Sequence, residues 1–293
     1  MTTIKNTLLL LLLASSLTSC IEDIEETPDA STTPAAVQQA LFESWGSADP
    51  LTMAPNDFLF QETEQKIESR QVPFFVLQEG ITISKKEEKP TEWEYTYLYQ
   101  TKTFKPSPDG STQEEGPVST REDRRYVDKG SSDLVAENLR AQNELSTFAD
   151  DYQMSLGIER LFGLAGACVK SADFEKLCKE QLGADSCDIA CSNLKVTEET
   201  VPAPDLIKAQ PNCGGLANCS MRIKKVAFDW SLILKKGEAT EKNRVNYWIS
   251  MSPDMPFFAR VTEYCFRQLY PVQGQKILVT SCTKLKNFKK GGS

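Results

Sequence analysis

Cysteine spacing constrains this chain more than any other feature of its sequence. Nine cysteines are present, and eight of them follow residue 20. An even number of cysteines in an exported chain is typical of a disulfide framework, so we expect four disulfides among them. The alternative is a thiolate metal site built on Cys187-x-x-x-Cys191, but the chain has no histidine to complete it. The eight residues are Cys168, Cys178, Cys187, Cys191, Cys213, Cys219, Cys265 and Cys282.

The first twenty residues indicate that the chain is exported. Lys5 precedes an apolar run at 7–14 that contains six consecutive leucines, and small residues follow it. This is the layout of a secretory signal, and the run is too short to span a bilayer as a helix. The residues Leu17-Thr18-Ser19-Cys20 then resemble the lipobox of bacterial lipoproteins. The resemblance implies cleavage before Cys20 and acylation of its thiol, whereas the alternative is a secreted protein with a free thiol there.

The lipobox resemblance also implies a membrane anchor and a location. The resemblance implies a diacylglycerol on the thiol and a further acyl group such as palmitate, and each CH₂ group of their acyl chains that is buried in the membrane contributes about 0.8 kcal/mol. In enteric sorting an aspartate after the lipidated cysteine favours the inner membrane, whereas this chain has Ile21. We therefore expect an outer-membrane lipoprotein, on the periplasmic face or at the cell surface.

Composition divides the chain into three parts. Residues 1–19 form the predicted signal peptide, 20–34 a flexible lipidated tether, and 35–293 a single α+β domain with a helical, cysteine-rich insertion at about 132–219. The formal charge of −8 becomes −9 without the signal, because Lys5 is its only charged residue. A negative body argues against nucleic acid as a partner.

Alternating patterns predict a β-rich region after residue 70. Strands are expected at 72–78, 81–84 and 92–104, with a further strand returning at 121–127. The clearest strand carries four large rings on one face, which could line a groove for a hydrophobic or peptide ligand. Large rings on a strand are more often core residues, and this alternative stays open. The four rings belong to Trp93, Tyr95, Tyr97 and Tyr99.

The middle of the chain is predicted to be helical. Ser132 can cap a helix that begins at residue 133, and a second helix is expected at 173–181. Disulfide connectivity cannot be deduced from sequence alone. The pairing that we favour closes a helical hairpin with two nested bridges and a small loop with a third: Cys168–Cys191, Cys178–Cys187 and Cys213–Cys219.

The last part of the chain is predicted to be a four-stranded antiparallel meander, with strands at about 221–235, 244–251, 256–270 and 276–283. If Gln273-Gly274 is a two-residue hairpin loop, residues that face each other have numbers that sum to 547. Cys265 and Cys282 satisfy this sum at a non-hydrogen-bonded position, where Cα atoms lie about 4.5 Å apart. We therefore predict a disulfide between these two residues.

The residue types exclude many kinds of catalysis. Without histidine, the Ser-His-Asp triads, Cys-His nucleophiles and HExxH zinc proteases are impossible. Two Ser-x-x-Lys matches, at Ser192 and Ser281, lack companion motifs, and Ser281 lies on a predicted strand that points Lys284 to the opposite face. Acidic pairs such as Glu114-Glu115 could serve glycan hydrolysis, but runs of carboxylates are usually solvated. We expect no enzyme activity, no cofactor and no metal.

Together these patterns predict an α+β fold with a curved antiparallel sheet and a disulfide-stapled helical segment. The strand at 245–250, the turn at Pro253 and the next strand resemble the half-barrel of lipoprotein-carrier proteins, whose concave sheet holds acyl chains. The expected function is a non-enzymatic envelope module that binds a hydrophobic or peptide ligand, or a partner protein, at a sheet face. A structural or assembly subunit of an envelope complex is the alternative, followed by a histidine-free hydrolase.

Overall fold

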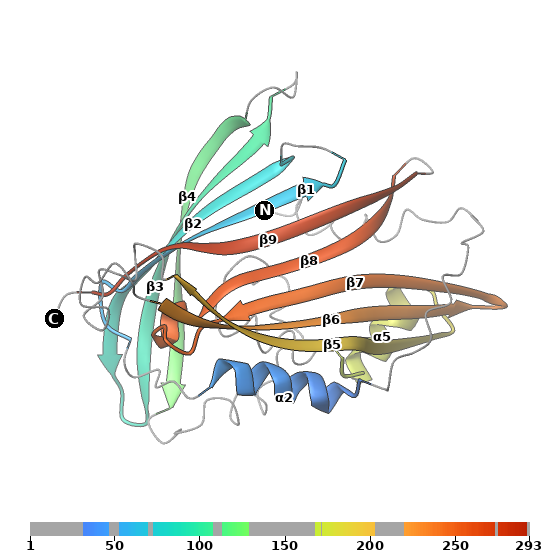
Figure 1. Ribbon diagram of the computed structural model, residues 1–293, viewed down its shortest axis with the longest axis horizontal. Helices are drawn as coiled ribbons and strands as arrows, with labels where there is room; N and C mark the ends of the chain where they lie inside the picture. Colours follow the sequence, from blue (N-terminus) through green and yellow to red (C-terminus); the bar gives the residue numbers. More distant parts are fainter. Residues whose placement is uncertain are drawn as a thin grey trace.

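The computed structural model describes residues 32–46, 53–69, 73–107, 113–128, 168–170, 172–202, 220–272 and 275–291. Within these ranges the chain forms nine strands, two α-helices and a short 3-10 helix (Figure 1). The elements in chain order are α2 (Pro34–Trp45), β1 (Phe58–Ile67), β2 (Phe75–Glu88), β3 (Glu92–Pro106), β4 (Gln113–Asp128), α5 (Ala172–Gln181), β5 (Ser186–Pro202), β6 (Ser220–Lys236), β7 (Ala239–Met251), η4 (Phe257–Ala259), β8 (Val261–Val272) and β9 (Gln275–Lys289).

All nine strands belong to one antiparallel sheet, in the order β4-β3-β2-β1-β9-β8-β7-β6-β5. Neighbours in the sheet are also neighbours in the chain, except at the centre, where β1 pairs with β9. This central pairing extends from Phe58 opposite Lys289 to Ile67 opposite Val279. Strands β4 and β5 are the two edges, and the sheet twists strongly between them (Figure 1).

The α+β class predicted from the sequence is wrong, because the described chain is mostly β. Helices α2 and α5 contain 12 and 10 residues, whereas β5 and β6 each contain 17. The four expected C-terminal strands exist as β6 to β9, but they are part of the nine-stranded sheet and do not form a separate meander. Within the expected helical insertion, α5 is a helix, 186–202 is strand β5, and 129–167 lies outside the described residues.

The aromatic rings of β3 lie in a hydrophobic core. Tyr95, Tyr97 and Tyr99 are 0%, 9% and 6% exposed, and Trp93 packs against the same cluster. Strand β6 pairs with β7 only from Lys224 onward. The residues of β6 before Lys224 pack in the core with the tyrosines. The rings therefore act as core side chains in this structure and do not line an open groove.

Helix α2 covers the half of the sheet that contains β6 and β7. The side chain of Thr33 accepts a hydrogen bond from the backbone of the first turn, and Pro34 follows at the first helical position. Gly46 ends the helix with a φ of 67°, a conformation that favours glycine. Val37 and Leu41 are both 0% exposed, because they pack against buried side chains of β6, β7 and β8.

Three disulfides lie within the described residues. Cys265 and Cys282 face each other across the β8–β9 hairpin with Cα atoms 4.2 Å apart, and they are the pair that the hairpin register predicts. The nested pairs Cys168–Cys191 and Cys178–Cys187 are also joined. They do not close a helical hairpin as expected, because Cys187 and Cys191 lie on strand β5. The predicted pair Cys213–Cys219 lies outside the described residues.

A buried arginine connects the end of α2 to the segment between β7 and β8. Arg260 is 6% exposed, and its guanidinium donates hydrogen bonds to the backbone carbonyls of Trp45, Pro253 and Met255. The guanidinium also lies over the indole of Trp45, 5.7 Å from the ring centroid. Burial lowers the pKa of Arg260, while the charge of nearby Asp254 opposes this shift.

Candidate functional site: the β5 edge and the groove beside α2

Within the described residues, strand β5 has a neighbouring strand on one side of its backbone only. Among the described strands it pairs with β6 alone. Six consecutive residues, 195–200, are exposed, so both faces of this part of the strand reach the surface. Val196 is 51% exposed although its side chain is apolar. An exposed strand edge presents unpaired N–H and C=O groups, to which a strand of another chain can be added.

A groove of about 260 Å³ lies between α2 and strands β5 and β6. Val196 and Glu198 line it from β5, and Lys224 lines it from β6, with its Nζ 3.9 Å from a carboxylate oxygen of Glu198. The lining mixes apolar and polar side chains, so the groove could accept either kind of peptide side chain. The residues that α2 contributes are Ala36, Gln39, Ala40, Glu43 and Ser44.

A β-bulge precedes the exposed segment of β5. The register between β5 and β6 shifts between Ser192 and Lys195, and Asn193 there has a left-handed φ of 56°. Asparagine tolerates this conformation better than most residues, and a bulge increases the local twist. The side-chain amide of Asn193 donates a hydrogen bond of 2.6 Å to Asp229 on β6. The bulge is therefore held firmly against the neighbouring strand.

Asp229 connects three strands through its carboxylate. It is 7% exposed, and Arg244 and Asn246 of β7 donate to it in addition to Asn193 of β5. Burial alone would raise the pKa of Asp229, but the hydrogen bonds from these three side chains outweigh it and hold the pKa below its usual range. The carboxylate is consequently ionised near neutral pH and stabilises the β5 side of the sheet.

Replacing Asp229 by asparagine is expected to lower the free energy of unfolding at pH 7 by about 1–2 kcal/mol, because hydrogen bonds to a charged acceptor are lost. The folded-state pKa lies below the unfolded value of about 3.9. The stabilisation is therefore complete above the unfolded value and is lost as the pH falls through the folded-state pKa. Urea unfolding at pH 7 and pH 2.5 should show a smaller loss of stability on acidification in D229N than in the wild type. Equal losses would contradict this account.

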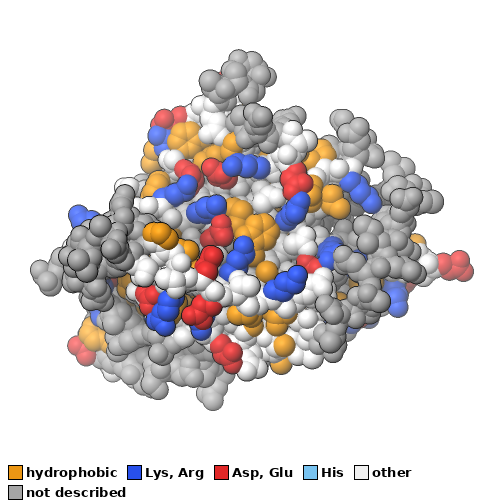
Figure 2. All heavy atoms as spheres, in the orientation of Figure 1, with side chains coloured by type: hydrophobic (Ala, Val, Ile, Leu, Met, Phe, Trp, Pro, Cys, Tyr) orange, Lys and Arg blue, Asp and Glu red, His pale blue; other side chains and the backbone are white. Residues whose placement is uncertain are grey.

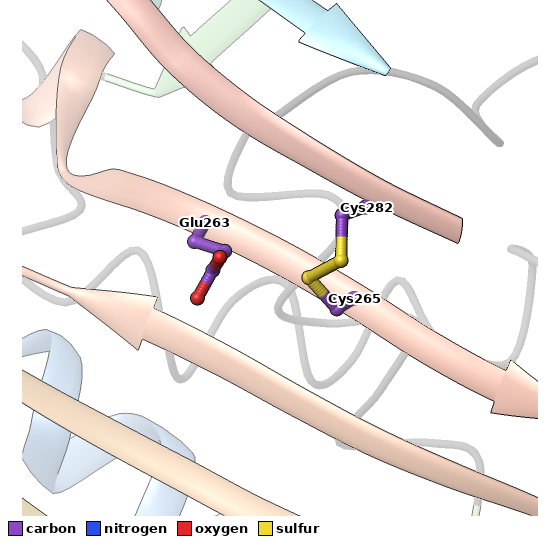
Figure 3. Close-up of side chains that lie close together, drawn as sticks. All are labelled: Glu263, Cys265 and Cys282. Carbon is purple, nitrogen blue, oxygen red and sulfur yellow. A yellow bond between two sulfur atoms is a disulfide. The ribbon is translucent and has the colours of Figure 1, made fainter. Parts of the chain in front are cut away.

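One cluster of side chains has possible metal-ligand atoms close enough together to bind an ion. Among the described residues, Glu263, Cys265 and Cys282 form a group whose possible ligand atoms lie within 4.8 Å of one another (Figure 3). The two sulfur atoms are joined in a disulfide, so neither is a thiolate that could bind a metal. The Glu263 carboxylate lies 3.3 Å from both the Nζ of Lys284 and the hydroxyl of Ser250. The cluster is therefore a disulfide beside an ion-paired carboxylate.

The Ser-x-x-Lys matches do not assemble as catalytic pairs. Ser281 is buried on one face of β9, whereas Lys284 lies on the opposite face and pairs with Glu263. Ser192 lies at the bulge of β5, and Lys195 follows it on the exposed segment. The acidic pair Glu114-Glu115 is exposed on edge strand β4. On the described surface in view, basic and acidic side chains are interspersed without a large area of one sign (Figure 2).

Comparison with known proteins gives two remote structural neighbours. No protein-family model and no curated protein matches the chain. A "putative lipoprotein" from Parabacteroides distasonis ATCC 8503 is 13% identical over 81% of this chain and 96% of its own, with a TM-score of 0.30. A "putative exported protein with YmcC-like fold" from Bacteroides fragilis NCTC 9343 is 13% identical over 81% and 97%, with a TM-score of 0.29. At these TM-scores neither likeness carries a conclusion about this chain.

The expectation of export and lipidation continues to rest on residues 1–20, which lie outside the described residues together with the tether up to residue 31. Neither α2 nor α5 is long and apolar enough to cross a membrane, and the described residues contain no other α-helix. Acylation of Cys20 therefore stays a prediction from the lipobox resemblance.

Proposed function

We propose that this chain is an exported, lipid-anchored protein of the cell envelope that binds a partner protein along the β5 edge and catalyses no reaction. The observation that carries the proposal is the run of exposed residues 195–200 on the unpaired side of the sheet. In strand addition, main-chain hydrogen bonds supply affinity and alternate side chains that enter pockets supply specificity. The groove beside α2 adjoins this segment and could receive such side chains.

The location in this proposal is the outer membrane. A lipidated Cys20 followed by Ile21 supports that location, and the tether up to Thr33 has a mean reach of roughly 20 Å. Such a tether would keep the folded body near the membrane surface, where other anchored envelope proteins are concentrated. Assembly into an envelope complex is a form of the same proposal, because the partner is a protein.

A hydrophobic ligand on β3 is less well supported than a protein partner. The three tyrosines expected to line a groove are packed in the core, and Met221 and Ile223 of β6 belong to the same cluster. The absence of catalysis is proposed because the chain has no histidine and because its two Ser-x-x-Lys matches lie in arrangements that do not suit proton transfer.

In-cell photo-crosslinking tests the proposed function. The full-length chain is expressed in its native envelope with a photo-reactive phenylalanine analogue in place of Val196. The matched control carries the same analogue in place of Leu269 on β8, because each of these two side chains is 51% exposed. We expect the Val196 variant to give a discrete crosslinked protein product, identified by mass spectrometry, and the Leu269 variant to give at least about tenfold less. No product from the Val196 variant, or equal products from both, would remove the proposal.

A further inference from the structure

We infer that the partner on the β5 edge is a second copy of this chain, paired antiparallel with the first about a twofold axis that passes through Thr197. The inference rests on the proposed use of the β5 edge and names the occupant. Two observations carry it: the direction of the free backbone groups on β5, and a self-complementary arrangement of charges between Lys195 and Glu199.

The direction of the backbone groups follows from the register across the sheet. The Cα separation of 4.2 Å between Cys265 and Cys282 marks a non-hydrogen-bonded pair, so the backbone groups of Cys265 point toward β7. Cys265 lies opposite Trp248, Trp248 opposite Ala227, and Ala227 opposite Lys195, without a bulge at these positions. Hydrogen-bonded and non-hydrogen-bonded pairs alternate along this row of residues, from one strand pair to the next. The backbone groups of Trp248 therefore point toward β8, those of Ala227 toward β5, and those of Lys195 toward β6.

The same alternation fixes the neighbours of Lys195 on β5. Thr197 and Glu199 direct their N–H and C=O groups to β6, whereas Val196, Glu198 and Thr200 direct theirs outward. An added antiparallel strand therefore forms hydrogen-bonded pairs at Val196 and Glu198. Thr197 becomes a non-hydrogen-bonded position, where the Cα atoms of the two strands lie about 4.5 Å apart.

Charge selects one of the possible twofold registers. With the axis at Thr197, Val196 of each copy lies opposite Glu198 of the other, and Lys195 lies opposite Glu199. Two equivalent Lys–Glu pairs then form at close, non-hydrogen-bonded positions, where opposite charges stabilise the pairing. With the axis at Glu198, that carboxylate would instead lie directly opposite itself, and like charges in this position are destabilising.

Lys195 and Glu199 are available for such pairs. Both are exposed, and neither has a salt-bridge partner among the described residues. The other sheet edge, β4, differs in this respect. Arg124 on that strand already lies 3.7 Å from Glu94 and 3.9 Å from Glu122, and Arg121 stacks over the ring of Tyr99. Lys195 and Glu199 on β5 therefore differ from Arg121 and Arg124 on β4, because the two arginines already have partners among the described residues.

Cysteine substitution tests the register directly. In the membrane-anchored chain, Thr197→Cys puts two thiols face to face across the axis, within the Cα range that a disulfide accepts. Thr200→Cys on the same strand faces residue 194 of the other copy, and Thr120→Cys lies on the β4 edge. Under mild oxidation we expect the T197C dimer to form at least about tenfold faster than either control dimer, as read on non-reducing gels. Equal rates for T197C and T200C, or no T197C dimer, would overturn the inference.

Charge reversal in the T197C background provides a second readout. Lys195→Glu and Glu199→Lys should each slow dimer formation about tenfold, and the two together should restore it, because the pair is then reversed in both copies. Failure of the double reversal to restore the rate would overturn the charge argument. The two proposals can fail separately. If the Val196 variant crosslinks to a different protein and T197C stays monomeric, this inference is refuted and the proposed function stands. If the Val196 variant gives no crosslinked protein and T197C gives no dimer, both the inference and the proposed function are refuted.

Discussion

Replacing Arg260 by leucine is expected to lower the free energy of unfolding by about 3 kcal/mol, because three backbone carbonyls lose a buried, charged donor. Two of those carbonyls belong to Pro253 and Met255 in the segment before Arg260, and the third belongs to Trp45 at the end of α2, 215 residues before Arg260 in the chain. In a domain of this size, such a loss lowers Tm by roughly 6–12 °C. Urea unfolding and thermal melting of the purified protein measure the two quantities.

A second arginine in the same region provides the control for this experiment. Arg222 pairs with Asp254 at 2.6 Å, but its side chain is 56% exposed. An exposed ion pair of this kind contributes little to stability, so Arg222→Leu should have a much smaller effect than Arg260→Leu. If both leucine variants lost the same free energy, the buried contacts of Arg260 would not explain its role.

Removing the Cys265–Cys282 disulfide by replacing both cysteines with alanine is expected to destabilise the protein by about 3 kcal/mol in the chain-entropy account. The bridge joins residues 17 positions apart, and Cys265 is 0% exposed, so alanine avoids burying a hydroxyl group there. Urea unfolding without reductant measures the change. If the fold is intact, the slope of the free energy of unfolding against urea concentration should be unchanged.

The bridge between Cys178 and Cys187 is the matched comparison. It spans a sequence separation of only 9, so its removal should cost less than removal of Cys265–Cys282 in the same account. Non-reducing peptide mapping of the wild type is the companion measurement. Finding Cys265 or Cys282 joined to another cysteine would contradict both the structure and the hairpin register.

The C-terminal hairpin could be predicted from sequence because local chemistry determines it. The pairing of Val272 with Gln275, as expected for a two-residue loop, and the two-residue period of a strand are enough to bring Cys265 opposite Cys282, without knowledge of the rest of the sheet. The returning strand expected at 121–127 is likewise part of β4, opposite the aromatic strand β3.

Strands β1 and β5 were missed for physical reasons. The inward face of β1 is partly polar, because Gln61 bonds with Glu79 of β2 and Thr63 bonds with Thr283 of β9. Buried polar pairs remove the hydrophobic alternation that identifies a strand. The segment 195–200 of β5 is exposed on both faces, so it has no alternation either, and it lies within the helical, cysteine-rich insertion expected at about 132–219. The candidate site therefore depends on an edge that only the assembled sheet reveals.

The pairing of β1 with β9 has a consequence for how the chain reaches its native state. The strand at Phe58–Ile67 cannot complete its hydrogen bonds until the last strand, Gln275–Lys289, is available. Such a high contact order makes folding slow, because the two ends must meet before the centre of the sheet can close. Until the strand at Gln275–Lys289 has been synthesised, one side of the Phe58–Ile67 backbone has no β9 to pair with, so the centre of the sheet is the last part that can close.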